Sequence, residues 1–248
     1  MKKGFLYLGI AGWIMSGIVS ANEHASDLYV GVGYGVIPGV ESEQEDYIKF
    51  SDANNGFIQL GYKISENFAI EGQYSKSTKD ASEKVFFGDM RVNRISWDEI
   101  VQMNPAWNAA MAQSAYPYAF MNLALTFDVN VETTAIYGVY RSSGDLYFKV
   151  KAGYLREKST LKIKPKSFDL YAYDQRHNKI AMASVAKGEK YFDAFAGRMD
   201  QKFSKSESAF SAGLGAGYQF TARLFSELEY TMLKSDLNFY SLSINYAF

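Results

Sequence analysis

Cysteine is absent from this chain of 248 residues, and proline occurs only 4 times. Without cysteine there is no disulfide framework and no thiol that could carry a lipid at the N-terminus. Histidine occurs only twice, and no set of histidine and carboxylate residues has the spacing of a metal site. The sequence therefore predicts no metal and no cofactor.

An excess of one charge and a long apolar run are missing as well. The chain has 26 basic and 27 acidic residues and a formal net charge of -1, which excludes the strongly basic surface expected of a nucleic-acid-binding domain. Beyond the first 22 residues, no apolar run approaches the ~20 residues of a membrane-spanning helix. A mean hydropathy of -0.20 is still compatible with a membrane β-barrel, because polar inward residues dilute the apolar signal of such strands.

The N-terminal segment has the features of an export signal. Lys2 and Lys3 precede an uncharged stretch that runs to residue 22, and Val19-Ser20-Ala21 supplies small residues at its end. This pattern predicts a signal peptide over residues 1–21, cleaved after Ala21, and a mature domain over residues 22–248. A membrane-spanning helix is the alternative; the small residues at the end of the apolar stretch favour cleavage.

Eight segments alternate between apolar residues and small or polar residues, as strands with one apolar face do. They are residues 28–36, 56–64, 68–75, 123–140, 146–160, 210–220, 224–232 and 240–248. In the first, Gly31, Gly33 and Gly35 share a face with Tyr29. Their strict period of two, with no helix following, argues against a nucleotide-binding loop and for the inner wall of a narrow barrel.

In the segment 123–140, one face is more apolar than the other, and we expect the more apolar face to point outward. The expected outward set is Leu125, Phe127, Val129, Val131, Ala135, Tyr137 and Val139, and the expected inward set is Asp128, Asn130, Glu132 and Thr134.

The connections between these segments alternate between short and mostly longer ones. Short turns are expected at 65–67, 142–145 and 221–223, and long loops near 77–120 and 161–207. The first long loop should contain one or two helices between residues 96 and 115, broken at Pro105, with Ser96 and Glu99 as a capping box. The second contains two strand-like pieces, 168–173 and 179–185. We expect an external hairpin there, because charged residues interrupt both faces; two further membrane strands, giving a ten-stranded barrel, are the alternative.

Five short motifs in these segments are typical of a known protein family. They are Gly31-Val-Gly-Tyr-Gly35, Asn67-Phe-Ala-Ile-Glu-Gly-Gln-Tyr74, Gly213-Leu-Gly-Ala-Gly-Tyr-Gln-Phe220, Glu227-Leu-Glu-Tyr230 and Tyr246-Ala-Phe248. With the short and long connections in alternation, the chain resembles the OmpA/OmpX-like outer-membrane β-barrel family, a porin-like family that includes opacity-protein and surface-antigen relatives. The resemblance implies an all-β, transmembrane, antiparallel up-and-down barrel of eight strands, monomeric, in the bacterial outer membrane with its lipid and lipopolysaccharide.

The same resemblance implies a role for the C-terminal strand. Its outward residues would be read by the barrel-assembly machinery during biogenesis. These residues are Tyr240, Leu242, Ile244, Tyr246 and Phe248.

Charged residues at inward positions form the main candidate site. They are Lys63, Glu71, Glu132, Lys149, Lys151, Glu227 and Glu229. An eight-stranded barrel is only wide enough to be filled by side chains, and buried charges must be paired. We therefore expect an ion-pair network that plugs the lumen; a narrow pore gated by these pairs is the alternative.

Three functions are consistent with the sequence. The preferred one is a structural or surface-interaction role, in which the external loops contact host, phage or neighbouring cell surfaces. The alternative is a small-solute channel. A surface hydrolase is remote, because His177 and Asp174 have no identifiable nucleophile beside them and His24 lies next to the predicted cleavage point.

Overall fold

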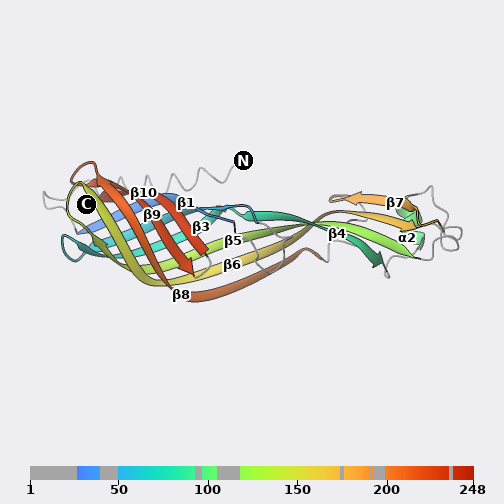
Figure 1. Cartoon of the computed structure of the whole chain (residues 1–248), viewed down its shortest axis with the longest axis horizontal. Coiled ribbons are helices and arrows are strands. Elements are labelled where there is room, and N and C mark those ends of the chain that lie inside the picture. Colours follow the sequence, from blue (N-terminus) through green and yellow to red (C-terminus); the bar gives the residue numbers. More distant parts are fainter. Residues whose placement is uncertain are drawn as a thin grey trace.

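The computed structural model describes residues 27–39, 50–92, 97–104, 118–173, 176–189, 192, 199–234 and 237–248. Most of these residues are in antiparallel strands (Figure 1). The strands are β1 (Leu28–Ile37), β2 (Ala53–Lys63), β3 (Phe68–Lys79), β4 (Ala81–Val92), β5 (Ala119–Arg141), β6 (Leu146–Tyr173), β7 (Lys179–Ala186), β8 (Gln201–Gln219), β9 (Leu224–Lys234) and β10 (Leu237–Ala247), and one helix, α2, covers Trp97–Met103. The signal peptide expected at residues 1–21 lies outside the described residues.

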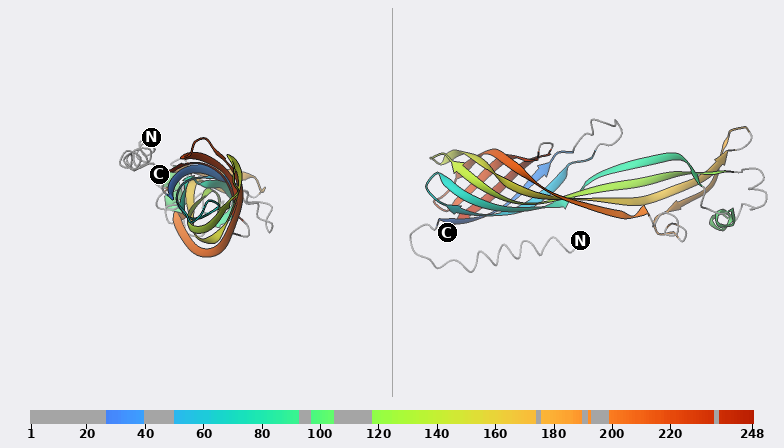
Figure 2. Two further views of the ribbon diagram at one scale, coloured as in Figure 1. Left: turned by 90° about the vertical axis from the view of Figure 1, so that its left-hand side faces the viewer. Right: turned by 90° about the horizontal axis from the view of Figure 1, so that it is seen from below.

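Within the described part of the chain, eight strands close into a barrel. Their order around the ring is β1, β2, β3, β5, β6, β8, β9 and β10. The ring closes by antiparallel pairing of β1 with β10, with Tyr29 opposite Ala247 and Val36 opposite Tyr240. The end-on view in Figure 2 shows this ring. The predicted eight-stranded up-and-down barrel is therefore confirmed.

The outer wall of the barrel is an apolar band between two rings of aromatic side chains. Short turns follow β2, β5 and β8, and the aromatic ring at this turn end consists of Tyr62, Phe68, Phe148, Tyr218 and Phe220. The ring at the opposite end consists of Tyr34, Tyr74, Tyr154, Phe210, Tyr230 and Tyr240. Between them, exposed aliphatic residues such as Leu60, Ile70 and Ile244 cover the wall. Such a band with aromatic girdles is the surface of a barrel that spans a membrane.

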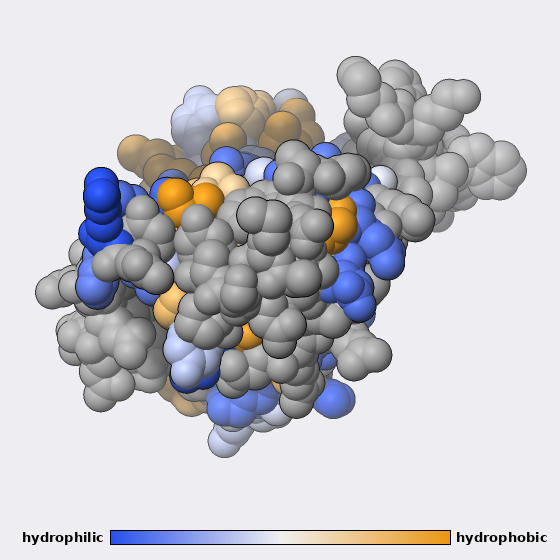
Figure 3. All heavy atoms as spheres, turned by 90° about the vertical axis from the view of Figure 1, so that its right-hand side faces the viewer, coloured by the Kyte–Doolittle hydropathy of each residue, from blue (hydrophilic) through white to orange (hydrophobic). Residues whose placement is uncertain are grey.

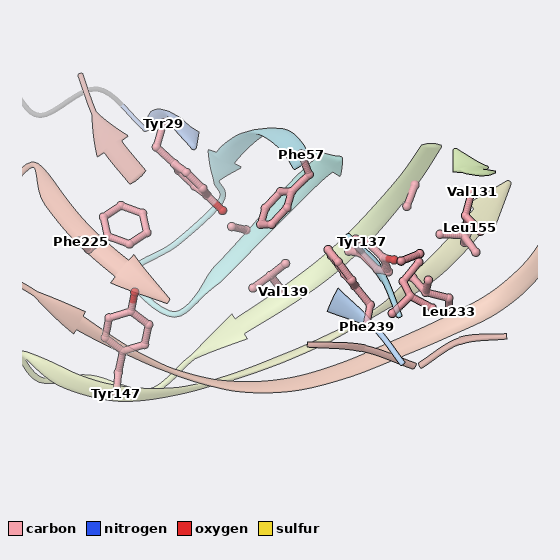
Figure 4. Close-up of a cluster of buried hydrophobic side chains, with 14 of the residues drawn as sticks. Tyr29, Phe57, Val131, Tyr137, Val139, Tyr147, Leu155, Phe225, Leu233 and Phe239 are labelled. Carbon is pink, nitrogen blue, oxygen red and sulfur yellow. The ribbon is translucent and has the colours of Figure 1, made fainter. Parts of the chain in front are cut away.

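The inner wall uses glycine to make room for large side chains. A Cβ atom on Gly61 would lie 1.9 Å from the ring of Tyr29, and one on Gly33 would lie 2.2 Å from the ring of Phe57. The space is filled by a cluster of buried aromatic and aliphatic side chains, among them Tyr29, Tyr137 and Phe239 (Figure 4). The glycine pattern read from the sequence thus belongs to a packed lumen.

One strand has the opposite face inward from the one predicted. In β5 the buried residues include Val131, Ala135, Tyr137 and Val139, which were expected to face lipid. The even-numbered residues point outward instead, and Ile136 is 64% exposed. The prediction was wrong because it assigned the more apolar side of the strand to the membrane. In this narrow barrel the lumen beside β5 is itself apolar, so hydrophobicity does not distinguish the two faces.

Beyond the barrel, five strands form a sheet that is continuous with the barrel wall, here called the extension. It consists of the initial part of β5, the last part of β6, the initial part of β8, and β4 and β7, with α2 packed against it. β4 pairs with β5 from Ala81 opposite Val129, and β7 pairs with β6 from Ala186 opposite Ser167. Figure 1 shows this sheet projecting far beyond the barrel. Much of the two segments expected to be loops, 77–120 and 161–207, is therefore strand.

The extension has its own hydrophobic core, which explains why it is ordered as a sheet. One sheet face buries Met121, Leu123, Phe168 and Leu170 under Ile100 of α2. The predicted external hairpin is confirmed, because the end of β6 pairs with β7 outside the ring. The expected first helix corresponds to α2; Ser96 and the stretch after Asn104 up to residue 117 lie outside the described residues. Among the described residues, no helix has the length and apolar character needed to cross a membrane.

Candidate functional site

Six charged side chains meet inside the barrel. The cations are Arg141, Lys149 and Lys151, and the anions are Glu71, Glu227 and Glu229. β3 and β9 are four strands apart in a ring of eight, so Glu71 and Glu227 come from opposite walls. The cluster therefore bridges the full width of the lumen.

Lys149 is the centre of this cluster. Its Nζ lies 2.9 Å from Glu71 Oε2, 2.8 Å from Glu227 Oε2 and 2.8 Å from Glu229 Oε1. Its side chain is 1% exposed. Because an isolated ammonium would not be stable at this degree of burial, the three carboxylates are what allows Lys149 to be charged there.

Arg141 and Lys151 neutralise the remaining charge. Arg141 Nη2 lies 2.5 Å from Glu71 Oε1, and its Nε lies 2.8 Å from Glu227 Oε1. Lys151 Nζ lies 2.5 Å from Glu229 Oε2. With three cations and three anions, the cluster has no formal net charge.

Neutral side chains complete the hydrogen bonding around the carboxylates. The Tyr29 hydroxyl donates to Glu71 Oε1 at 2.6 Å, and the Tyr147 hydroxyl donates to Glu227 Oε1 at 3.0 Å. The side chains of Tyr29 and Tyr147 belong to the buried cluster inside the barrel (Figure 4). The arrangement holds its charges in fixed positions across the lumen.

Five of the seven predicted lumen charges are brought together, and two are not. Lys63 is half-buried near the turn end, with no ion pair among the described residues. Glu132 lies on the outer wall, because β5 has the opposite face inward, and accepts a hydrogen bond from the Tyr74 hydroxyl at 3.0 Å. Arg141 was missed. The sequence offered one indication of its position. Neighbouring residues of a strand face opposite sides, so an outward Tyr140 would have placed Arg141 inward.

The second candidate site is the exposed face of the extension, on the side opposite its core. Phe120 of β5 stacks on Tyr171 of β6 at 5.9 Å between ring centroids. Lys179 Nζ lies 3.6 Å from the centroid of the Tyr171 ring. Nearby, Arg91 lies 3.6 Å over the exposed ring of Tyr118. A hollow of about 410 Å³ lies beside Tyr171 and Lys179 at the β7 edge of the sheet. Its lining is both polar (Asn104, Asn122, Asp169 and Ser184) and apolar (Leu170, Ala181, Met182 and Ala183), and Leu170 and Met182 also belong to the core of the extension.

A β-bulge supports this face. The register of β4 against β5 shifts between Phe87 and Met90, and Asp89 adopts a positive φ of 54° there. The Asp89 carboxylate accepts hydrogen bonds from the hydroxyls of Tyr171 and Tyr173. The bond from Tyr171 is the main cause that holds the pKa of Asp89 below its usual value. Figure 3 views the molecule from the extension end. On the described part of this surface, hydrophilic and hydrophobic side chains lie side by side.

The remaining predicted residues are placed as follows. His177 lies in the turn between β6 and β7 with a φ of 62°, and Asp174 and His24 lie outside the described residues. In β10, Tyr240, Leu242 and Ile244 are exposed on the outer wall, and Tyr246 packs edge-on against Phe248 at 5.5 Å.

A family model described as outer membrane protein beta-barrel domain matches residues 11–248. No curated protein sequence matches the chain. Similar solved structures include the Neisserial surface protein NspA, with 10% identity, a TM-score of 0.47 and coverage of 91% of this chain and 100% of NspA. Ail, the attachment invasion locus protein of Yersinia pestis, has 10% identity and a TM-score of 0.44 with 90% and 98% covered. OprG from Pseudomonas aeruginosa has 8% identity and a TM-score of 0.43 with 91% and 97% covered.

Proposed function

Because this chain belongs to the outer membrane protein β-barrel family, we propose that it is a surface-interaction protein, anchored by the barrel and making contact through the extension. Its place is the bacterial outer membrane. The observation that carries the proposal is the extension, a sheet with a core of its own that projects from the barrel. A protein that served only to fill the membrane would need no such structure.

The length of the extension fits a macromolecular partner. Ala119, at the far end of β5, lies 13 residues beyond Glu132, which is near the rim of the barrel. At ~3.3 Å per residue, the end of the extension lies up to roughly 40 Å beyond the rim. This distance suits contact with another cell, a phage or a host surface, because it reaches out from the lipid headgroups.

The exposed face of the extension has the side chains that dominate binding interfaces. Phe86 is 77% exposed and Tyr118 is 50% exposed, and Arg91 lies over the Tyr118 ring. Aromatic and arginine side chains carry most of the binding energy in protein interfaces. Large exposed aromatics outside the membrane band have no lipid to cover them, which favours a partner at this face.

The test compares adhesion by cells that display two variants. One combines Phe86→Ser, Arg91→Gln and Tyr118→Ser; the control is Phe203→Ser, which removes an exposed aromatic from β8. Both should retain the heat-modifiable gel shift of a folded barrel. We expect at least a tenfold loss of binding for the triple variant and wild-type binding for the control. Equal binding by the wild type, the triple variant and the control would show that the exposed face of the extension takes no part in the interaction.

The small-solute channel is opposed by the charge cluster, which crosses the lumen without net charge. Planar-bilayer conductance of the refolded protein separates the two roles. We expect no discrete channel steps. Reproducible steps that change in Glu229→Gln would replace the surface role with a channel, and a hydrolytic activity lost in His177→Ala would replace it with the surface hydrolase.

Biogenesis is part of the same proposal. Residues 1–21 direct export and are then removed, so N-terminal sequencing of the mature protein should start at Asn22. The outward residues of β10, together with Phe248 directly after it, then act as the signal for the barrel-assembly machinery. Phe248→Ala should lower the amount of assembled monomer in the outer membrane while total synthesis is unchanged.

A further inference from the structure

The hollow at the β7 edge of the extension is separate from the other candidate surfaces. β7 pairs with β6, whereas Phe86 and Arg91 are on β4, which pairs with β5 on the other side of the sheet. Figure 1 shows β7 at the end of the extension that is far from the barrel. The volume of about 410 Å³ lies in the range of small-molecule binding pockets. A hollow of this size is large enough to hold a small ligand well away from the lipid.

A fixed ammonium group borders the hollow. The Nζ atom of Lys179 lies 3.6 Å from the centroid of the Tyr171 ring, and that ring is itself held by the hydrogen bond from its hydroxyl to Asp89. Within the described ranges, no carboxylate lies within ion-pair distance of Lys179. The ammonium therefore has N–H donors to offer to a ligand, and the aromatic ring already restricts where they lie.

The amide of Asn122 adds a second donor with a known orientation. Its Oδ1 accepts hydrogen bonds from the backbone N–H of Asp89 at 3.2 Å and from the Tyr171 hydroxyl at 3.3 Å. Because both partners are donors, they fix which end of the amide is the oxygen. Its Nδ2 donates to no acceptor in the part of the chain that the structure describes, so these N–H groups are available at the hollow.

An acceptor lies directly beside that amide. Asp169 is opposite Asn122 in the register of β5 and β6, and such cross-strand neighbours have Cβ atoms about 5 Å apart. Asp169 Oδ1 accepts a hydrogen bond from the Ser184 hydroxyl at 2.6 Å, while no described donor reaches Oδ2. A hydroxyl group both donates and accepts, so two adjacent hydroxyls on a ligand can use Asn122 and Asp169 together.

The rest of the lining favours an uncharged ligand with one apolar face. Asp169 and Lys179 are the only charged residues among those that line the hollow, so its formal charge is zero. A ligand with a net charge would be repelled by one of them, and a strongly anionic ligand would also meet Asp89 close to Lys179. Ala181 and Met182 supply apolar surface in the same hollow.

From these contacts we propose that the hollow binds an uncharged sugar ring with adjacent hydroxyl groups, as the terminal residue of a surface glycan. Asn122 and Asp169 bind neighbouring hydroxyls, Lys179 donates to a further oxygen, and the C–H face of the ring packs on Ala181 and Met182. The inference rests on the proposed surface-interaction role and names an uncharged glycan as the chemical class of the partner.

The experiment measures sugar binding by the refolded full-length mature protein in a zwitterionic detergent that contains no sugar. The probes are the methyl glycosides of glucose, galactose, mannose and N-acetylglucosamine, with methyl glucuronide as the charged arm, and saturation-transfer NMR follows each titration. The test variants are Asp169→Asn and Lys179→Met, both at exposed positions.

The matched controls are Asp200→Asn and Lys202→Met, which make the same changes at exposed positions of the extension. Lys202 is opposite Lys162, seven residues before Asp169 on β6, and thus roughly 23 Å from the hollow along the strand. Near-UV circular dichroism checks that the aromatic cluster around Tyr171 is unchanged in every variant.

We expect at least one of the uncharged glycosides to bind with a millimolar Kd, which is what the efficiency of drug-sized ligands gives for about 13 non-hydrogen atoms. Each test variant should bind it roughly tenfold more weakly, because each loses a hydrogen bond to a charged group. The controls should bind as the wild type does. Three results would overturn the site: no saturable binding of any uncharged glycoside, equal losses in the controls, or tighter binding of the glucuronide than of the glucoside.

Adhesion by the same variants separates this site from the surface role on which it rests. If no sugar binds and the triple variant of Phe86, Arg91 and Tyr118 still loses adhesion, the sugar site is wrong and the surface role stands. If a sugar binds while that variant and Asp169→Asn both adhere as the wild type does, the sugar site stands and the proposed surface role is wrong.

Discussion

Lys149 and Glu227 form an ion pair within the barrel, with 2.8 Å between Nζ and Oε2, and both side chains are almost completely buried. Glu71 reaches the same nitrogen from the opposite wall. One lysine thus connects both sides of the ring, and the stability of the barrel should depend on it more than on any exposed lysine.

Replacing Lys149 by methionine keeps most of its volume and removes its charge. The change leaves three buried carboxylates with two cations, so we expect a loss of about 3–5 kcal/mol in the free energy of unfolding. Urea titration of the heat-modifiable band in detergent measures it. Lys84→Met, at an exposed position on β4, should change the value by less than about 0.5 kcal/mol.

A second substitution tests whether charge balance is the cause. Adding Glu229→Gln to Lys149→Met restores equal numbers of cations and anions. The double variant should therefore be more stable than Lys149→Met alone. If it is less stable, the loss reflects packing around the lysine and not uncompensated charge.

The glycines of the inner wall should tolerate no side chain. In Gly61→Ala the new Cβ meets the Tyr29 ring, whose hydroxyl is fixed by Glu71. We expect a loss of about 1–3 kcal/mol, as for overpacked cores. Gly72→Ala is the matched control, because its Cβ on β3 would lie 4.0 Å from the nearest atom, Leu60 O. Equal stability of the two variants would contradict the packed lumen.

The absence of cysteine makes a direct test of the faces of β5 straightforward. Ile136 is 64% exposed and Ala135 is 3% exposed. A spin label on Ile136→Cys should be broadened by a lipid-soluble relaxation agent, while Ala135→Cys should resist labelling in the folded barrel. The reverse pattern would restore the face assignment expected from hydropathy.

One carboxyl group outside the membrane should titrate at low pH. Burial raises the pKa of Asp128, but hydrogen bonds from Lys164 and Ser82 outweigh it and leave the pKa below its usual value. Because this pKa is lower in the folded protein than in the unfolded chain, the stabilisation is present above about pH 3.9 and is lost as pH falls through the folded value. Carbon NMR of the carboxyl group measures it. Lys164→Gln should raise the pKa, and an unchanged titration would contradict the assigned bond.

Much of the barrel could be predicted from the sequence, because lipid on one side and a narrow lumen on the other impose strict alternation. β9 illustrates this, with Leu228 and Tyr230 outward and Glu227 and Glu229 inward. β5 could not be assigned in the same way, since Tyr137 and Val139 are apolar and yet fill the lumen. Polarity predicts orientation only where the two environments differ.

The sheet structure of the extension could not be predicted from the sequence, for a different reason. Outside the membrane, a sheet can expose charge on one face, and β6 carries Lys162 and Lys164 there, paired with Asp80 and Asp128. In the sequence, these lysines made the segment resemble a polar loop. In β4 the bulge between Phe87 and Met90 also shifts the alternation. The five lumen charges that do meet could be predicted individually, but their geometry required the ring to be closed.

The pairing of Tyr29 with Ala247 joins nearly the two ends of the described chain. The neighbouring pairs from β1 round to β9 can form between segments that arrive earlier, whereas β1 and β9 must both wait for β10, the last of the described strands. Until then β1 and β9 present unpaired edges, and unpaired edges lead to aggregation. The chain therefore has to be delivered whole and kept unfolded on the way. A stop codon shortly before residue 240 would yield an open sheet with two reactive edges, not a smaller barrel, and quality control should degrade it.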